Sequence, residues 1–190
     1  MTYSRPALPV TVRALNAAVA LAGAQGRRLL SLQPEQLLAR ARRDTGLDDF
    51  GGDYFREPLS RLCRSLEQDA QLTALGRIIA RRDILRLLAN RLRFVDIFKR
   101  HPEIAAQEIS APIFILGMPR TGTTSLHELL ALDPQFRVPL SWEVAYPFPP
   151  PETATYRSDP RIRQVDAELA GVDRLLPDFR YMHPMGAPLP

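Results

Sequence analysis

The front part of the chain shows the spacing of apolar residues that is typical of amphipathic helices. Apolar positions recur every three or four residues in four segments, which predicts a first helix from residue 9 to Gly23 or Gly26 and further helices over residues 34–46, 54–68 and 72–100. The last segment is the longest, and its apolar positions form one stripe of Leu75, Ile78, Leu85, Leu88, Leu92 and Val95. Residues 1–110 are therefore predicted to form a helical N-terminal region.

The pattern changes after residue 110. A short apolar run, Ile113–Leu116, is followed by a loop that begins at Gly117 and ends at Gly122. Leucines then return at helical spacing over residues 123–132. This order predicts a short buried strand, a tight loop and a helix that starts where the loop ends.

The rest of the chain is rich in proline, with 13 of the 18 prolines after residue 110. Residues 136–139 form a candidate second strand, and residues 141–153 read as a proline-stiffened loop. A further helix is predicted from about Asp159 to Leu176. Residues 111–190 therefore favour the α/β class, with an incomplete parallel sheet. Because a parallel sheet needs more strand–helix units than these, we expect a fragment or a severely reduced catalytic domain.

Composition narrows the functional classes. The 25 basic residues are 24 arginines and Lys99, against 21 acidic residues, and the arginines alternate with acids along the predicted helices. This pattern argues against nucleic-acid binding. No apolar stretch approaches the roughly 20 residues of a membrane span, and the first residues do not resemble a signal peptide, so a cytoplasmic location is expected. Cys63 is the only cysteine, and no Cys/His cluster has the spacing of a metal site.

The loop is close to a nucleotide-binding template without matching it. Gly117 and Gly122 have the spacing of the G-x-x-x-x-G-K-[ST] motif, and Thr124 matches its last position. Thr123, however, stands where the motif has lysine, and the cation of this loop is Arg120. Because that lysine reaches the terminal phosphates of a nucleoside triphosphate, its absence argues against ATP or GTP hydrolysis.

These residue types are suited to holding a phosphate. Backbone N–H groups at the start of a helix carry partial positive charge and point at an anion. Hydroxyl groups on residues 121 and 123–125 add further donors, and Arg120 adds a permanent cation that can bridge two oxygens. The loop can therefore stabilise a phosphate that departs as an anion.

The string PRTGTT after an apolar run, followed by LHELLALDP, resembles the 5′-phosphosulfate loop of sulfotransferases that use 3′-phosphoadenosine-5′-phosphosulfate (PAPS). The runs FRVPLSWEVAYPFPPPE and YMHPMGAPLP resemble a bacterial branch of that family with a helical N-terminal extension. The resemblance implies a P-loop-type sulfotransferase fold that starts at residue 111. It also implies that Arg120 stabilises the leaving phosphate and that Thr121, Gly122, Thr123 and Thr124 surround it, with no metal required.

Sulfuryl transfer also needs a base that takes the proton of the acceptor, a hydroxyl or an amine. By the resemblance, this base is a glutamate or a histidine after the loop helix. Glu143 lies 23 positions after Arg120 and is the first candidate, and His183 is the second. A surface glutamate beside a structural tryptophan explains Glu143 equally well. Aromatic side chains near the proline-rich loop suggest a hydrophobic small-molecule acceptor.

Two other functions remain open from the sequence. One is a P-loop kinase or another nucleotide-phosphate transferase, and the other is a catalytically silent module whose helices mediate association. Nothing in residues 144–190 matches the segment with which sulfotransferases hold the 3′-phosphate of PAPS. Adenosine 3′,5′-bisphosphate binding without metal would favour the sulfotransferase, whereas a requirement for ATP and magnesium would favour the kinase.

Overall fold

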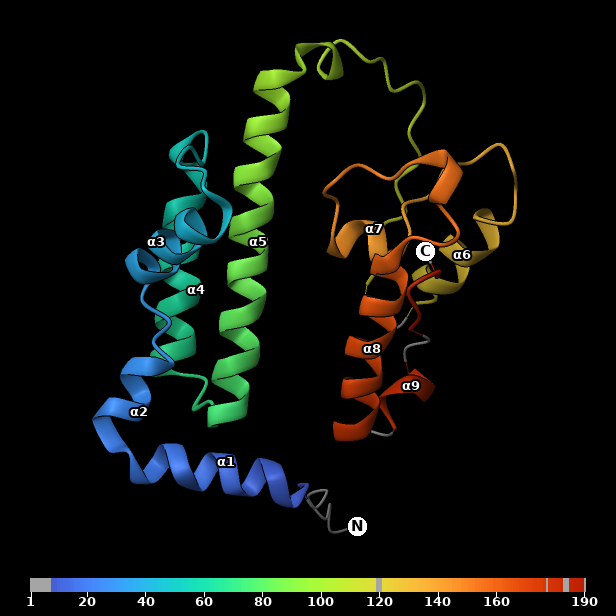
Figure 1. Cartoon of the computed structure of the whole chain (residues 1–190). Helices are drawn as coiled ribbons and strands as arrows, with labels where there is room; N and C mark the ends of the chain where they lie inside the picture. The colour runs from blue at the N-terminus through green and yellow to red at the C-terminus, as the bar shows by residue number, and fades with distance from the viewer. Residues whose placement is uncertain (1–7, 119–120, 177, 183–184, 190) are drawn as a thin grey trace. The chain divides into compact units, whose positions relative to one another are not determined.

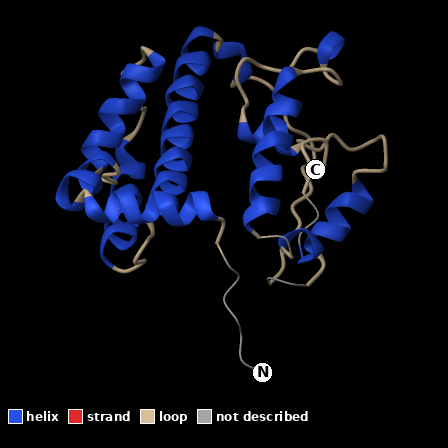
Figure 2. Ribbon diagram, turned by 60° about the horizontal axis from the view of Figure 1, so that its bottom comes forward, coloured by secondary structure: helices blue, strands red, loops and turns tan. Residues whose placement is uncertain are grey.

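The computed structural model describes residues 8–118, 121–176, 178–182 and 185–189 (Figure 1). The chain divides into two compact units, Met1–Ala106 and Gln107–Pro190, and each is described by itself. Among the described residues, every regular element is a helix (Figure 2). None of these helices combines the length and the apolar character that a membrane span requires.

Five α-helices form the first unit. They are α1 (Val10–Leu21), α2 (Gly23–Leu29), α3 (Pro34–Thr45), α4 (Arg56–Gln68) and α5 (Ala74–Arg100), with short 3₁₀ turns at Asp53–Phe55 and Pro102–Ile104. Three of the four predicted helices are confirmed almost to the residue. Pro34 opens α3 in its first turn, and the Thr73 hydroxyl accepts a hydrogen bond from the Gly76 N–H at the start of α5. The first predicted helix ends beside the earlier of its two predicted stops: α1 ends at Leu21, and Gly23, with a φ of 54°, begins the separate helix α2.

Helix α5 is the centre of this unit. Helices α3 and α1 pack against it, and α4 packs against α3 (Figure 1). Leu88 and Leu92 of the predicted stripe enter a core with side chains from α3 and α4, and so does Ile84, which the stripe did not include. Leu37 and Leu92 are completely buried. Cys63 lies in the same core, where burial raises the pKa of its thiol. The core joins helices distant in sequence through the apolar faces that the periodicity predicted.

Arg91 of α5 organises the glycine-rich loop between α3 and α4. Its guanidinium donates to the backbone oxygens of Phe50, at 2.7 Å, and of Gly52, at 3.0 Å. The same group lies over the rings of Tyr54 and Phe55, 4.6 and 4.2 Å from their centroids. Hydrogen bonds and ring contacts from one planar cation therefore fix a loop that lacks regular structure.

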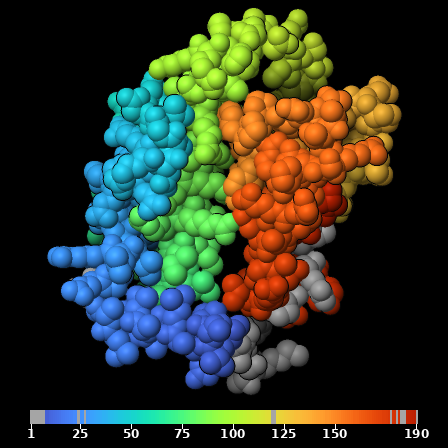
Figure 3. Space-filling model, in the orientation of Figure 1, coloured from blue at the N-terminus to red at the C-terminus, as the bar shows by residue number. Residues whose placement is uncertain are grey.

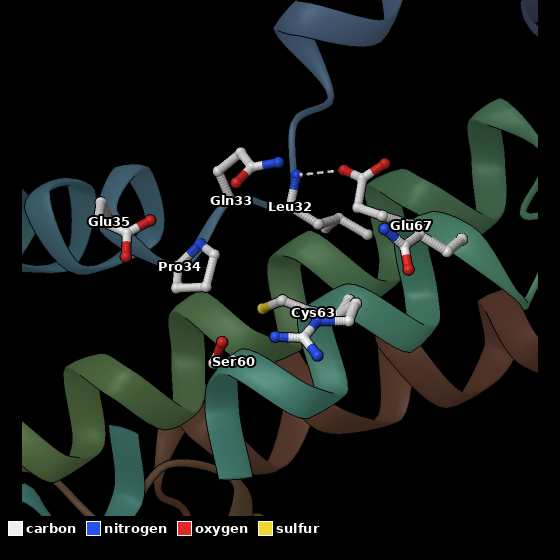
Figure 4. A pocket seen from close by; sticks show the side chains of 9 residues that line it. Leu32, Gln33, Pro34, Glu35, Ser60, Cys63 and Glu67 are labelled. Carbon is white, nitrogen blue, oxygen red and sulfur yellow. Dashed lines mark hydrogen bonds between the residues drawn. The ribbon is translucent and has the colours of Figure 1, made fainter. Parts of the chain in front are cut away.

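A small pocket of about 280 Å³ lies where the segment before α3 meets α4 (Figure 4). Glu67 closes one end, because its carboxylate accepts the backbone N–H of Leu32, at 2.9 Å, and pairs with Arg77, at 2.7 Å. The hydrogen bond from Arg77 is the main reason why the pKa of Glu67 is lowered. The carboxylate thus connects α4, α5 and the segment before α3.

The second unit contains α6 (Thr123–Leu130), α7 (Ser141–Ala145), α8 (Pro160–Leu175) and α9 (Phe179–Met182), with a 3₁₀ turn at Thr153–Thr155. Helix α8 is the helix predicted from about Asp159 to Leu176 and is confirmed. Helix α7 packs against α8 through a core around Trp142, Val165 and Ala187, of which Trp142 is completely buried. Residues 185–189 are held there by backbone hydrogen bonds from Ser141 to Leu189 and from Trp142 to Ala187.

The two predicted strands are absent from the described residues, so the expected sheet is not observed there. Residues Ile113–Leu116 have no regular structure, and Phe114 and Leu116 are 79% and 91% exposed. A strand needs a neighbouring backbone, and no backbone hydrogen bond joins these four residues to another described segment. Residues 136–139 are also irregular, and the following residues form α7 instead of an open loop.

Candidate functional site

The loop after Ile113–Leu116 folds tightly back on itself. A Cβ atom on Gly117 would lie 2.7 Å from Thr123 Cγ2 and 2.8 Å from Thr121 Oγ1, so only glycine fits this approach. The Thr121 hydroxyl donates to the backbone oxygen of Met118, at 2.6 Å. The start of the loop is therefore packed directly against the residues that begin α6. Pro119 and Arg120 lie outside the described residues.

Helix α6 begins where the loop ends. Gly122 is its N-cap and has a φ of 88°, a left-handed conformation that suits glycine. The first helical hydrogen bond runs from the Leu126 N–H to the Gly122 oxygen, at 3.0 Å. The N–H groups of the residues before Leu126 are thus not used by the helix ladder and carry its partial positive charge. Thr123 and Thr124 are the first two helical residues and stand at this end.

An open pocket of about 400 Å³ lies beside this helix start. Thr123, Thr124 and His127 line one side, and three residues of the apolar run, Ile113 to Ile115, line the other. Hydroxyl groups at the positive end of a helix thus border a space that is open to solvent. This arrangement suits an oxygen-rich anion, which accepts hydrogen bonds from both kinds of donor.

Glu143, the predicted base, lies in α7 and is only 7% exposed. Its Oε2 accepts hydrogen bonds from the Leu140 N–H, at 2.8 Å, and from the Tyr156 hydroxyl, at 2.7 Å. Its Oε1 pairs with Arg137 Nη2. Three donors from a loop, a tyrosine and an arginine therefore hold one buried carboxylate in place. The description of Glu143 as a simple surface glutamate is wrong.

The electrostatics of this cluster favour the charged form of the acid. Burial by itself would raise the pKa of Glu143, but the hydrogen bonds from Leu140, Tyr156 and Arg137 and the charge of Arg137 together lower it. Burial, followed by the hydrogen bond to Glu143, raises the pKa of the Tyr156 hydroxyl. Glu143 is therefore an ionised carboxylate and Tyr156 a neutral donor at neutral pH.

A second ion pair supports the same region. Asp159 caps α8 by accepting from the Arg161 N–H, and its carboxylate pairs with the Arg161 guanidinium at 2.6 Å. Arg161 also donates to the backbone oxygens of Tyr146 and Pro149, and its guanidinium lies 4.8 Å from the ring centroid of Trp142. Arg161 thus connects the segment that follows α7 to the start of α8.

The structure does not bring all the predicted site residues together. Helix α6 packs against no other helix of the described part, and no hydrogen bond joins Thr121–Thr124 to Glu143 among the described residues. His183, the second candidate base, lies outside the described residues. Arg137 and Tyr156 were not predicted, because nothing in their local sequence indicates that residues 6 positions before and 13 positions after Glu143 contact it.

The chain is similar to proteins of one known family. The model of the sulfotransferase family matches residues 112–189. Sulfotransferase STF1 of Mycobacterium tuberculosis H37Rv superposes with a TM-score of 0.67 at 37% identity and covers 82% of this chain. Sulfotransferase STF9 of Mycobacterium avium gives a TM-score of 0.65 at 33% identity over 73% of this chain. No significant match occurs among proteins of curated function.

The two solved structures are longer than this chain. The aligned part is 43% of the Mycobacterium tuberculosis chain and 35% of the Mycobacterium avium chain. The similarity nevertheless extends beyond residues 112–189 into the helical first unit, since it covers most of this chain. The chain therefore belongs to the sulfotransferase family.

Proposed function

We propose that the chain contributes the 5′-phosphosulfate site and the base of a sulfotransferase that uses PAPS as sulfuryl donor. The observation that carries this proposal is the loop at residues 117–124. Gly117 lies close to Thr121 and Thr123, Gly122 is left-handed at the start of α6, and Thr123 and Thr124 of this helix start line one open pocket. In this proposal, residues 111–190 are the start of the P-loop sulfotransferase domain, and residues 1–110 are a helical N-terminal region.

The roles follow from the chemistry of the donor. PAPS supplies a sulfuryl group attached to a phosphate that must leave as an anion. Thr121, Gly122, Thr123 and Thr124 would hold the 5′-phosphate by hydrogen bonds, and Arg120 would stabilise the charge that grows on the departing oxygen. No acid cluster suited to a metal is found among the described residues, and the proposal needs none.

Glu143 would act as the base. The acceptor, a hydroxyl or an amine of a small molecule, would give its proton to a carboxylate oxygen while an O–S or N–S bond forms. The S–O bond to the phosphate then breaks, and its electron pair leaves with adenosine 3′,5′-bisphosphate. Glu143 is ionised, as a base must be, and three donors hold its oxygens in place; its lowered pKa also makes it a weaker base than an ordinary glutamate. His183 is the alternative base.

The first experiment measures binding by calorimetry with the full chain and EDTA. Adenosine 3′,5′-bisphosphate is expected to bind without metal and more tightly than ATP with magnesium. Preference for ATP with magnesium would favour a nucleotide-phosphate transferase. Absence of binding to either ligand would favour a silent helical association module instead.

A second experiment tests the base with Glu143→Gln. Donor-dependent release of adenosine 3′,5′-bisphosphate is measured from PAPS with a panel of alcohol and amine acceptors. The variant is expected to bind the nucleotide as before and to lose transfer. The emission of Trp142, the only tryptophan, checks that its surroundings are intact. Near-normal transfer by a folded variant would move the base to His183.

A further inference from the structure

A second pocket, of about 530 Å³, lies next to Glu143 within the second unit. Its polar lining consists of two arginines and three hydroxyl residues: Arg137, Thr153, Tyr156, Arg157 and Ser158. None of its lining residues is acidic. We call it the arginine pocket. Part of the surrounding segment is visible as the orange surface in Figure 3.

The two arginines of this pocket differ in their partners. Arg137 pairs with Glu143, so its charge is balanced within the protein. Arg157 is exposed and has no hydrogen bond or ion pair to any described residue. Asp159, two positions later, is already paired with Arg161, and Glu152 is a neighbour in sequence but does not line the pocket. The arginine pocket therefore carries one uncompensated guanidinium.

The arginine pocket shares two walls with the environment of Glu143. Tyr156 lines the pocket and donates to Glu143 Oε2, and Arg137 lines the pocket and pairs with Glu143 Oε1. The centroid of the Tyr156 ring lies 5.4 Å from that of the buried Trp142. The guanidinium carbon of Arg137 also lies over the Tyr156 ring, 5.7 Å from its centroid. A ligand in the pocket would thus contact the same side chains that hold the carboxylate.

We propose that the arginine pocket binds an anionic group of the acceptor, namely a carboxylate, a phosphate ester or a sulfate ester. Arg157 supplies a two-pronged cation for such oxygens, and the hydroxyl of Thr153 supplies a further donor, whereas the Ser158 hydroxyl donates to the Thr155 backbone oxygen at 3.4 Å. This inference rests on the proposed function, because the ligand is the acceptor only if the neighbouring Glu143 is the base. It replaces the hydrophobic acceptor suggested by composition.

The test is an NMR titration of the full chain with inorganic phosphate, methyl sulfate and acetate as separate probes. Saturating adenosine 3′,5′-bisphosphate is present, so that the loop at residues 117–124 is occupied. A titration with sodium chloride to the same ionic strength is the control. Saturable shifts of the backbone amides at residues 153–158 are expected. The probe that saturates at the lowest concentration identifies the kind of anion.

Three variants decide the role of Arg157. Arg157→Ala is expected to weaken binding at least tenfold, and Arg157→Lys to restore part of the affinity. Arg163→Ala removes an exposed arginine of α8 that does not line the pocket and should leave the affinity unchanged. Equal affinity in Arg157→Ala and Arg163→Ala, or shifts confined to residues 117–124, would overturn the proposal.

The result separates this inference from the proposed function. Anion binding at residues 153–158 in a protein that does not bind adenosine 3′,5′-bisphosphate would keep the pocket and reject the sulfotransferase role. If the protein binds the nucleotide but the anions cause no shifts at these residues, the sulfotransferase role is kept and the anion pocket is rejected. If both sites bind, anionic acceptors should transfer better than their neutral analogues, and Arg157→Ala should raise KM for the anionic ones alone.

Discussion

The hydroxyl of Tyr156 donates a hydrogen bond to Glu143 Oε2 over 2.7 Å. The two residues are 13 positions apart, on either side of the proline-rich segment, so this bond ties the start of α8 to α7. With Arg137 on the other oxygen, it turns an isolated acid into the centre of a small polar cluster.

Tyr156→Phe removes this donor and leaves the ring in place. Because hydrogen bonds to a buried charged group are worth more than neutral ones, the free energy of unfolding should fall by about 1–2 kcal/mol. Urea denaturation followed by Trp142 emission measures the second unit, since the chain has one tryptophan. Tyr54→Phe, which loses a 3.2 Å hydrogen bond from Arg91 in the first unit, is the matched control and should not move this transition.

The stability of the second unit should depend on pH in the acid range. The pKa of Glu143 is lowered in the folded state, and so is that of Asp159, chiefly by its hydrogen bond with Arg161. The unfolded chain therefore takes up protons first as the pH falls. The stabilisation is complete at a pH above the pKa values that these acids have in the unfolded chain. It is lost as the pH falls through their lower pKa values in the folded state.

Denaturation midpoints between pH 7 and pH 3, read from Trp142 emission, check this dependence. Glu143→Gln should flatten the curve and leave the contribution of Asp159. A curve that is as steep in the variant as in the wild type would show that other acids cause it.

Gly117→Ala should impair the loop. Its Cβ would meet Thr123 and Thr121 below 3 Å, so the loop must open to accept the methyl group. Affinity for adenosine 3′,5′-bisphosphate should fall about tenfold or more, which corresponds to about 1.4 kcal/mol for each factor of ten. Calorimetry measures this affinity.

Gly171→Ala is the control for this substitution. Gly171 lies inside α8, and nothing lies within 4 Å of its added Cβ. Alanine should therefore raise the stability of this helix by about 0.5–1 kcal/mol and leave nucleotide affinity unchanged. Equal affinities in the two variants would mean that the close approach at Gly117 is not needed for binding.

Arg120→Ala tests the role assigned to the loop cation. If Arg120 meets charge that grows mainly as the phosphate departs, transfer should fall about 100- to 1000-fold while nucleotide affinity changes far less. The comparison uses the rate of adenosine 3′,5′-bisphosphate release and the calorimetric Kd. Losses of the same size in both would assign Arg120 to binding alone.

The helices could be predicted from the sequence because their signals are local. The stripe from Leu75 to Val95 and the first-turn proline Pro34 lie within the elements that they specify. The apolar run Ile113–Leu116 could not be assigned in the same way, because a strand needs a neighbouring backbone segment and the local sequence does not show which segment that is. The end of the first helix was indicated by Gly23, but the separate helix α2 was not predicted.

The candidate site shows the same division. The tight loop from Gly117 to Gly122 and the helix that follows could be predicted from spacing, because this loop is built from consecutive residues. The importance of Glu143 was predicted, but its contacts with Arg137 and Tyr156 were not. Those contacts depend on how the proline-rich segment returns to α7, which is a property of the folded chain.

The exposed run Ile113–Leu116 also bears on how this chain behaves in concentrated solution. Four consecutive apolar residues with no backbone partner in the described part offer an edge along which a second copy can align. We expect self-association that grows with protein concentration and that declines when a charge, as in Phe114→Lys, interrupts the run. The same residues that precede the phosphate loop are therefore the first place to look when a preparation precipitates.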